Sequence, residues 1–139
     1  MEKIGILLVG HGSRLEYNKQ LITVTAEMMH DKRPDTIIRS CFLEYSNPNV
    51  TAGLDLMKNE DIDTLLVVPL FLAKGIHIMR DIPRLLGLEG GAKVGSIVLA
   101  NGKTIPFAYA DPIGIDVLLA DLMLKNADAA YQLLAKESQ

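Results

Sequence analysis

Short apolar runs alternate with longer stretches of helical periodicity along most of the chain. The first three runs predict strands at residues 4–9, 36–43 and 64–72. The third run is almost continuously apolar, as expected of a strand buried on both faces of a parallel sheet. Strands that alternate with helices predict an α/β fold with a mostly parallel, helix-covered sheet.

The segment from residue 88 to residue 103 is rich in glycine and interrupts this alternation. Within it, Asn101-Gly102 is a hairpin signal that joins predicted strands at 96–100 and 105–110. A last helix is predicted after Pro112, where leucine, methionine and alanine recur at helical spacing.

Polar residues mark where the earlier helices should begin. Ser13 followed by Glu16 predicts a capping box at the start of the first helix. The apolar residues that recur at helical spacing in this helix are Tyr17, Leu21, Val24 and Met28. Asn47-Pro48 predicts the start of a second helix, and Asp81 is a possible cap for a third that ends near Gly87.

Composition limits the classes of protein to consider. The 139 residues are 49% apolar and 22% charged, which predicts a single folded domain over 1–139. A net charge of -3 argues against a nucleic-acid partner, which favours a basic surface. No apolar run reaches membrane-spanning length and the first is too short for a signal sequence, so we expect no membrane association and a cytoplasmic location. The single cysteine, Cys41, rules out an internal disulfide and a cysteine-based metal site within one chain.

Residues able to do chemistry cluster where the predicted strands end. In an open parallel sheet, ligands bind beyond the carboxyl ends of the strands. The first strand is followed by His11 and Arg14, the second by Glu44 and the third by the segment 72–77, which ends in His77. The fold prediction therefore gathers two imidazoles, a carboxylate and two cations at one edge of the sheet.

Each of these groups also has a plain structural interpretation. His11 lies between two glycines, which let a bulky ligand approach the main chain, although a turn histidine can simply bond a neighbouring carbonyl. The case for His77 is strengthened by Asp81, which lies within reach as an orienting carboxylate if the segment is helical. Glu44 is either a partly desolvated proton acceptor or an ordinary exposed acid, and the sequence leaves both open. Arg14 and Lys74 are candidate anchors for an anionic substrate.

Three common motifs are absent or incomplete. The segment from Gly10 to Leu15 lacks the third glycine of a dinucleotide-binding fingerprint, and there is no phosphate-loop Gly-Lys-Ser/Thr. A strand that ends in His-Gly is typical of histidine phosphatases, but those enzymes carry Arg before the histidine, whereas this chain has Gly10.

Four segments, in order, resemble the short class II chelatases, metal-inserting lyases that include archaeal sirohydrochlorin cobaltochelatases and nickelochelatases. The segments are GHGSR at 10–14, EYSNP at 44–48, VPLFLAKGIH at 68–77 and RDIPRLLG at 80–87, and DPIG at 111–114 matches the last strand-to-helix junction of that family. The resemblance spans essentially the whole chain.

The resemblance implies a flavodoxin-like, three-layer sandwich with a mostly parallel four-stranded sheet. The whole chain, 1–139, would be one half-chelatase domain, and two identical chains would pair as a homodimer to form the cleft. It implies that His11 is proton acceptor and metal ligand and that His77 is the other metal ligand. Residues matching expected tetrapyrrole contacts are Asn47, Leu72, Ala73, Lys74, Gly75, Ile76 and His77.

The implied reaction inserts Co2+ or Ni2+ into sirohydrochlorin, for cobalamin synthesis or for the nickel tetrapyrrole of methanogenesis. This reaction suits His11 and His77, because neutral imidazoles bind these ions. A site with only two imidazoles also holds an ion loosely enough to release it. His11, or a desolvated Glu44, would accept the protons that leave the macrocycle. We expect no cofactor besides the metal that is inserted.

Two other functions use the same residues. A non-enzymatic metal carrier or sensor would bind metal through His11 and His77 without a macrocycle site. A phosphatase would use His11 as its nucleophile and would not need His77.

Overall fold

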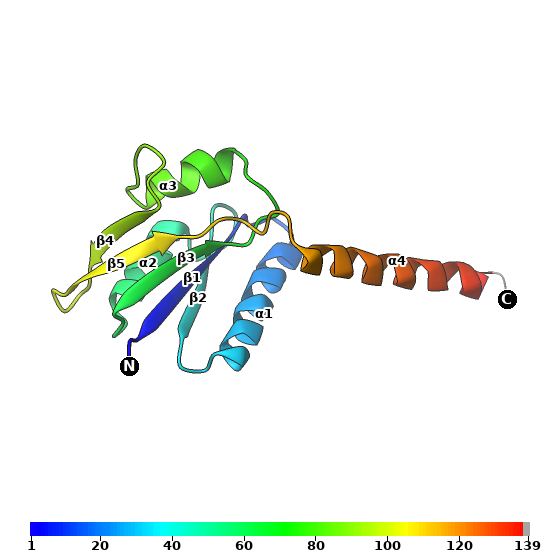
Figure 1. Cartoon of the computed structure of the whole chain (residues 1–139), viewed down its shortest axis with the longest axis horizontal. Helices are drawn as coiled ribbons and strands as arrows, with labels where there is room; N and C mark the ends of the chain where they lie inside the picture. The colour runs from blue at the N-terminus through cyan, green and yellow to red at the C-terminus, as the bar shows by residue number, and fades with distance from the viewer. Residues whose placement is uncertain (138–139) are drawn as a thin grey trace.

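The computed structural model describes residues 1–137, and its helices and strands alternate as the apolar pattern predicts (Figure 1). The strands are β1 (Ile4–Gly10), β2 (Ile37–Phe42), β3 (Thr64–Pro69), β4 (Val94–Val98) and β5 (Thr104–Tyr109). The helices are α1 (Glu16–Lys32), α2 (Val50–Lys58), the π-helix η1 (His77–Asp81), α3 (Ile82–Leu85) and α4 (Val117–Glu137).

The strands form one sheet in the order β2-β1-β3-β5-β4. Strands β2, β1, β3 and β5 pair in parallel, and β4 pairs with β5 in antiparallel orientation. The sheet therefore has five strands rather than four. The additional strand is the edge member of the hairpin predicted at Asn101-Gly102, where Gly102 adopts a φ of 89°.

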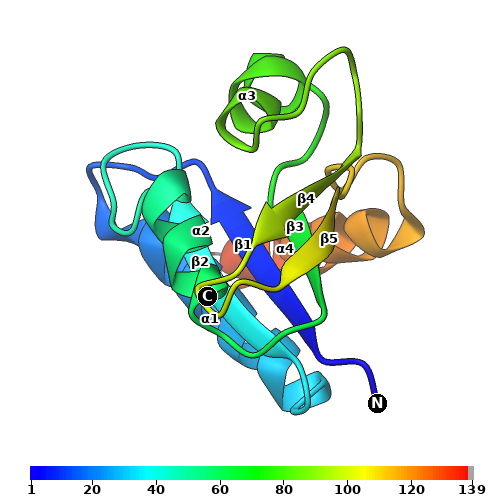
Figure 2. The same ribbon diagram turned by 90° about the vertical axis from the view of Figure 1, so that its left-hand side faces the viewer.

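Apolar side chains pack on both faces of this sheet, because successive residues of a strand point to opposite sides. Leu8 and Phe42 pack with Ile22 and Ala26 of α1 on one face. Leu7 and Val9 face the other way, into a cluster with residues of α2, η1 and α3. Figure 2 shows α3 above β4 and β5, the hairpin at the edge of the sheet, and Leu86 at the end of α3 packs in one cluster with Ile105 and Phe107 of β5. The arrangement is the predicted three-layer α/β fold.

Two predicted helix starts are wrong. Helix α1 begins at Glu16 after Leu15, which makes no side-chain cap, and the Ser13 hydroxyl instead accepts from the Leu15 N–H at 3.2 Å. In α2 the cap is Asn49, whose side chain accepts from the Ala52 N–H at 2.8 Å. The chain is still extended at Pro48, since the Pro48 carbonyl accepts from the Phe42 N–H at 2.9 Å.

The predicted start of the third helix and the predicted end of the third strand also differ from the structure. Asp81 caps no helix, because its carboxylate bonds His77 instead. Strand β3 ends at Pro69, and the residues up to Ile76 leave the sheet as an exposed loop.

Helix α4 projects away from the rest of the molecule (Figure 1). Its apolar side chains are largely exposed, including Leu118 at 66% and Met123 at 53%. The apolar stripe predicted for α1 is also exposed, with Tyr17 at 77% and Leu21 at 55%, while Ile22 and Ala26 are the buried residues of that helix. Two amphipathic surfaces are thus left without a partner among the residues that the structure describes. Among residues 1–137, no helix combines the length and apolar character needed to cross a membrane.

Gly12 gives a stability prediction. It has a φ of 87°, and a Cβ added there would lie 1.7 Å from the Glu44 carbonyl oxygen. We expect Gly12→Ala to lower the free energy of unfolding well beyond the ~1–2 kcal/mol of left-handed strain alone, because the Glu44 loop must move. Chemical denaturation measures this. Gly102→Ala is the control, since Gly102 has a φ of 89° and open space around it; equal losses for the two variants would contradict the prediction.

Candidate metal and catalytic site

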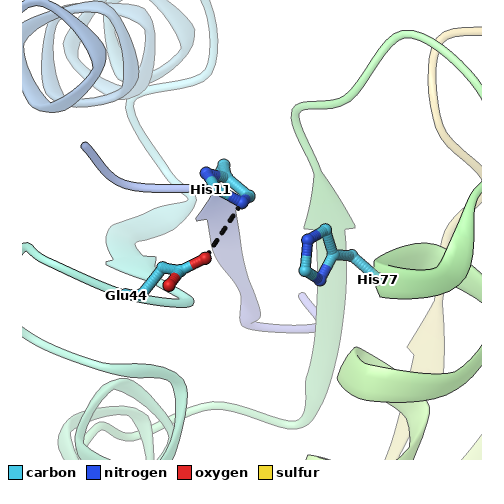
Figure 3. A group of neighbouring side chains, drawn as sticks. All are labelled: His11, Glu44 and His77. Atoms are coloured by element: carbon cyan, nitrogen blue, oxygen red, sulfur yellow. Dashed lines mark ion pairs between the residues drawn. The ribbon is translucent and has the colours of Figure 1, made fainter.

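Three side chains from three strand ends meet at the carboxyl edge of the sheet (Figure 3). His11 follows β1, Glu44 follows β2, and His77 begins η1 after β3. One ring nitrogen of each histidine and one carboxylate oxygen of Glu44 all lie within 4.8 Å of one another. The imidazole centroids of His11 and His77 are 4.9 Å apart. The two histidines and the carboxylate therefore meet as the strand-end argument predicts.

The loops of His11 and Glu44 are bound to each other through the backbone. The Glu44 N–H donates to the His11 carbonyl at 3.1 Å, and the missing side chain of Gly12 lets the Glu44 carbonyl approach. The Gly12 N–H donates to the Asn18 side chain of α1 at 2.8 Å. This backbone pairing holds the loops that carry His11 and Glu44 next to each other.

The His11 ring has one nitrogen committed to the backbone and one facing the site. Nδ1 lies 2.9 Å from the Gly12 carbonyl oxygen. Because a carbonyl only accepts, Nδ1 carries the hydrogen in this contact. Nε2 lies 3.2 Å from Glu44 Oε1 (Figure 3). When His11 is neutral, Nε2 therefore offers a lone pair beside a carboxylate.

His77 is oriented by a carboxylate of its own turn. Its Nδ1 lies 2.8 Å from Asp81 Oδ2, as expected from their spacing. The pKa of Asp81 is lowered, first by the hydrogen bond from Arg80 and then by the one from His77. An ionised Asp81 accepts from Nδ1–H, which leaves Nε2 of His77 free to bind a metal.

All three side chains are partly open to solvent. The exposed fractions are 41% for His11, 45% for Glu44 and 37% for His77. Of the two alternatives left open for Glu44, the structure has the exposed acid, because Glu44 lies on an exposed loop rather than under a neighbouring element. Two imidazoles and a carboxylate are ligands suited to cobalt, nickel or zinc, and an exposed site leaves coordination positions for another ligand.

The other predicted site residues lie around this cluster. Residues 72–76 form an exposed loop that leads directly into His77. Asn47 is exposed on the loop between Glu44 and α2. Arg14 stacks over the Tyr45 ring at 5.1 Å, so its guanidinium is held on the Glu44 side of the site.

Sequence reasoning missed two aromatic residues. The Phe71 ring lies 6.2 Å from the His11 ring and 6.3 Å from the His77 ring, and so contacts both. Its place in the segment just before His77 was the available signal. Tyr109, at the end of β5, bonds the backbone of η1, and no local pattern indicates that contact.

Comparison with known proteins places this geometry in a family. A family model described as CbiX matches residues 5–130. The sirohydrochlorin cobaltochelatase of Methanosarcina barkeri is 40% identical over 129 residues, which cover 93% of this chain and 98% of that protein.

Two solved structures of Bacillus subtilis SirB are similar to this chain over less than half of their own length. SirB with Fe3+ has a TM-score of 0.65 and 26% identity, covering 86% of this chain and 44% of that one. The sirohydrochlorin chelatase SirB of subspecies spizizenii in complex with cobalt has a TM-score of 0.59 and 27% identity, covering 82% and 45%. With the family model matching most of its residues and a relative aligned nearly end to end, this chain belongs to the CbiX family.

Proposed function

We propose that this protein inserts Co2+ into sirohydrochlorin, with His11 and His77 holding the ion. The observation that carries the proposal is the meeting of His11, Glu44 and His77 within 4.8 Å at an open edge of the sheet. The relative from Methanosarcina barkeri, which is named a sirohydrochlorin cobaltochelatase, supports the choice of macrocycle and metal.

These ligands are suited to transferring the metal ion to the macrocycle. Nε2 of His11 and Nε2 of His77 supply two neutral nitrogens, since both Nδ1 atoms are engaged elsewhere. A tetrahedral site closed by four protein ligands would hold the ion as a structural metal. Two imidazoles with one exposed carboxylate leave positions where the pyrrole nitrogens can replace the protein ligands.

Metal insertion also needs a proton acceptor. Each Co2+ that enters displaces two N–H protons from the macrocycle, so the charge balances. Nε2 of His11 accepts these protons one at a time once the ion has moved, and it passes the first to Glu44 Oε1, 3.2 Å away, before it accepts the second. Because Glu44 is 45% exposed, it can in turn release the protons to water.

The macrocycle would lie against the segments that flank the metal ligands. The exposed loop before His77 and Asn47 on the opposite side form its walls, in line with the family resemblance. Substrate carboxylates would be bound by Arg14 and Lys74, both exposed beside the site. The residues in these contacts are Arg14, Asn47, Leu72, Ala73, Lys74, Gly75, Ile76 and His77.

Nickel is the second candidate metal. Nitrogen sites bind divalent ions in a general order of affinity, so selection depends on supply and on geometry. The two SirB structures, one in complex with cobalt and one with Fe3+, illustrate this breadth in similar folds. The product would feed cobalamin synthesis with cobalt, or the nickel tetrapyrrole of methanogenesis with nickel.

We also propose that two copies pair as a homodimer, each a half-chelatase. This chain covers 44–45% of the length of SirB, so a second copy would supply an equivalent half. Helix α4 supports the pairing, because most of the stability of a helix in a protein comes from packing its apolar face, and the apolar face of this 21-residue helix is exposed in the single chain.

The chain offers a matching surface for that helix. On the α1 face of the sheet, β4 exposes Val94 at 66% and Val98 at 56%. The apolar stripe of α1, with Val24 at 40% and Met28 at 52% exposed, faces solvent on the same side of the sheet. We propose that α4 of each copy covers this surface of the other, a self-complementary arrangement typical of a two-fold dimer.

His77→Ala tests the metal site. We expect it to lower the rate of Co2+ insertion by about 100-fold or more, since removing a partner of a metal ligand alone costs roughly 10–100-fold. The change in sirohydrochlorin absorbance on adding Co2+ measures the rate, and a parallel series with Ni2+ compares the metals. His30→Ala is the control, because His30 bonds the Thr36 carbonyl at the far end of α1.

The same assay separates the rival functions. If the wild type binds Co2+ but does not raise the insertion rate above the uncatalysed one, a metal carrier or sensor is the better description. Phosphatase activity that survives His77→Ala and is lost in His11→Ala would favour the phosphatase.

Asp81→Ala tests the orientation of His77. The variant removes the acceptor of Nδ1–H, so we expect Co2+ affinity to fall by roughly 10–100-fold while the fold is retained. Asp81→Asn keeps an oxygen acceptor and should recover part of the affinity. Calorimetric titration with Co2+ measures both; an unchanged affinity in Asp81→Ala would show that Asp81 does not act on the metal.

The dimer is tested by a pair of matched variants. Met123→Glu/Leu134→Glu alters the apolar face of α4, whereas Lys125→Glu/Gln132→Glu alters its polar face. All four side chains are exposed in the single chain, so neither variant should disturb an isolated copy. We expect light scattering to show a dimer for the wild type and the polar-face variant and a monomer for the apolar-face variant. A monomeric wild type at tens of micromolar would refute the pairing.

A further inference from the structure

The π-helix that carries His77 leaves one backbone carbonyl without its usual donor. In an α-helix the N–H of Ile82 would donate to the carbonyl of Ile78, four residues earlier. In η1 that N–H donates to the His77 carbonyl instead. A π-type bond to Ile78 would come from residue 83, which is Pro83 and has no N–H.

The missing donor comes from β5, whose Tyr109 packs in the same core cluster as Ile78. The Tyr109 hydroxyl donates to the Ile78 carbonyl at 3.0 Å. Both residues are buried, with exposed fractions of 3% each, so no solvent competes for the contact. Burial is the main cause that raises the pKa of Tyr109 to about 12, and the nearby Asp111 adds to it, so the phenol stays protonated and able to donate.

We propose that Tyr109 is a positioning residue for His77, holding η1 in its π register by occupying the Ile78 carbonyl. With that carbonyl occupied, the Ile82 N–H stays on the His77 carbonyl. Without it, the Ile78 carbonyl is free to take back the Ile82 N–H and the turn converts to an α-helix. That conversion moves the backbone of His77, whose side chain faces His11 and Glu44.

Two features tie this contact to the metal site rather than to core packing alone. Short π segments are rare and are found frequently at functional sites. In this one the first residue, His77, and the last, Asp81, are joined side chain to side chain at 2.8 Å. A change of helical register therefore alters both the His77 backbone and the carboxylate that orients its ring. The inference rests on the proposed role of His77 as a metal ligand.

Lys93 also contacts Tyr109 and has to be separated from the hydroxyl. Its Nζ lies 4.7 Å from the centre of the Tyr109 ring and 2.8 Å from Asp111 Oδ1. Tyr109→Phe keeps the ring and removes only the hydroxyl, whereas Lys93→Met removes the cation and keeps the hydroxyl. The two variants form a matched pair, because each removes a different one of the two polar groups at the Tyr109 ring.

The first experiment compares these variants for Co2+ binding and insertion. We expect Tyr109→Phe to weaken Co2+ binding and slow insertion by about tenfold, with the KM for sirohydrochlorin unchanged, as for other groups that orient a metal ligand. The visible ligand-field spectrum of bound Co2+ should shift, and the NMR signal of His77 Nδ1–H should change. Lys93→Met should alter neither the spectrum nor the His77 signal.

The second experiment restores the donor from the backbone. Pro83→Ala returns an N–H at the position from which a π-type bond to Ile78 would come. The double variant Tyr109→Phe/Pro83→Ala should therefore recover Co2+ affinity and the wild-type spectrum. A folded double variant that binds Co2+ as weakly as Tyr109→Phe would overturn the proposal. Failure of both Tyr109→Phe and the double variant to fold would also overturn it, because Tyr109 would then be a general core residue.

The outcomes also distinguish this inference from the function on which it rests. If His77→Ala abolishes Co2+ binding and Tyr109→Phe leaves it unchanged, only the positioning role fails. If His77→Ala itself leaves Co2+ binding unchanged, the proposed metal site fails and the role of Tyr109 fails with it.

Discussion

The parallel pairing of β1 with both β2 and β3 is the constraint on which the site depends. The register places Gly10 opposite Phe42 and Val9 opposite Pro69, so the chain leaves all three strands at nearly the same level. His11, Glu44 and His77 come from these three exits, 33 residues apart in each case by their numbering. No local contact along the chain could bring them together, and a shift of pairing would separate them.

Most of the fold could be predicted from local sequence patterns, and the predictions that were wrong have physical causes. The strands and the Asn101-Gly102 hairpin were predictable because apolar runs and turn residues act locally. The cap of α1 was not, because Asn18 takes the Gly12 N–H and the Ser13 hydroxyl bonds Leu15, so the helix begins later than the polar pattern indicates. Hydrogen bonds in the turn after β1, rather than the spacing of Ser13 and Glu16, set where the helix begins.

The candidate site likewise has features that the sequence predicts and features that it does not. The sequence predicted that His11, Glu44 and His77 would meet, because the strand-end rule needs only topology. It could not predict the exposure of Glu44, which depends on how the loop lies. The π register of η1 was equally inaccessible, since it involves Tyr109, which lies 31 residues from Ile78. The amphipathic pattern of α4 likewise predicts that the helix has an apolar face, but it does not identify the surface that covers this face.

The two nitrogens of His11 have different partners, and this has a consequence for the order of events. Nδ1 stays with the Gly12 carbonyl, so only Nε2 exchanges ligands beside Glu44. On the proposed reaction, a cation and a proton compete for that one lone pair. Loading the ion excludes the proton, and transfer of the ion makes the same atom basic again. Departure of the metal would thus create the base that first accepts the macrocycle protons, with no conformational switch.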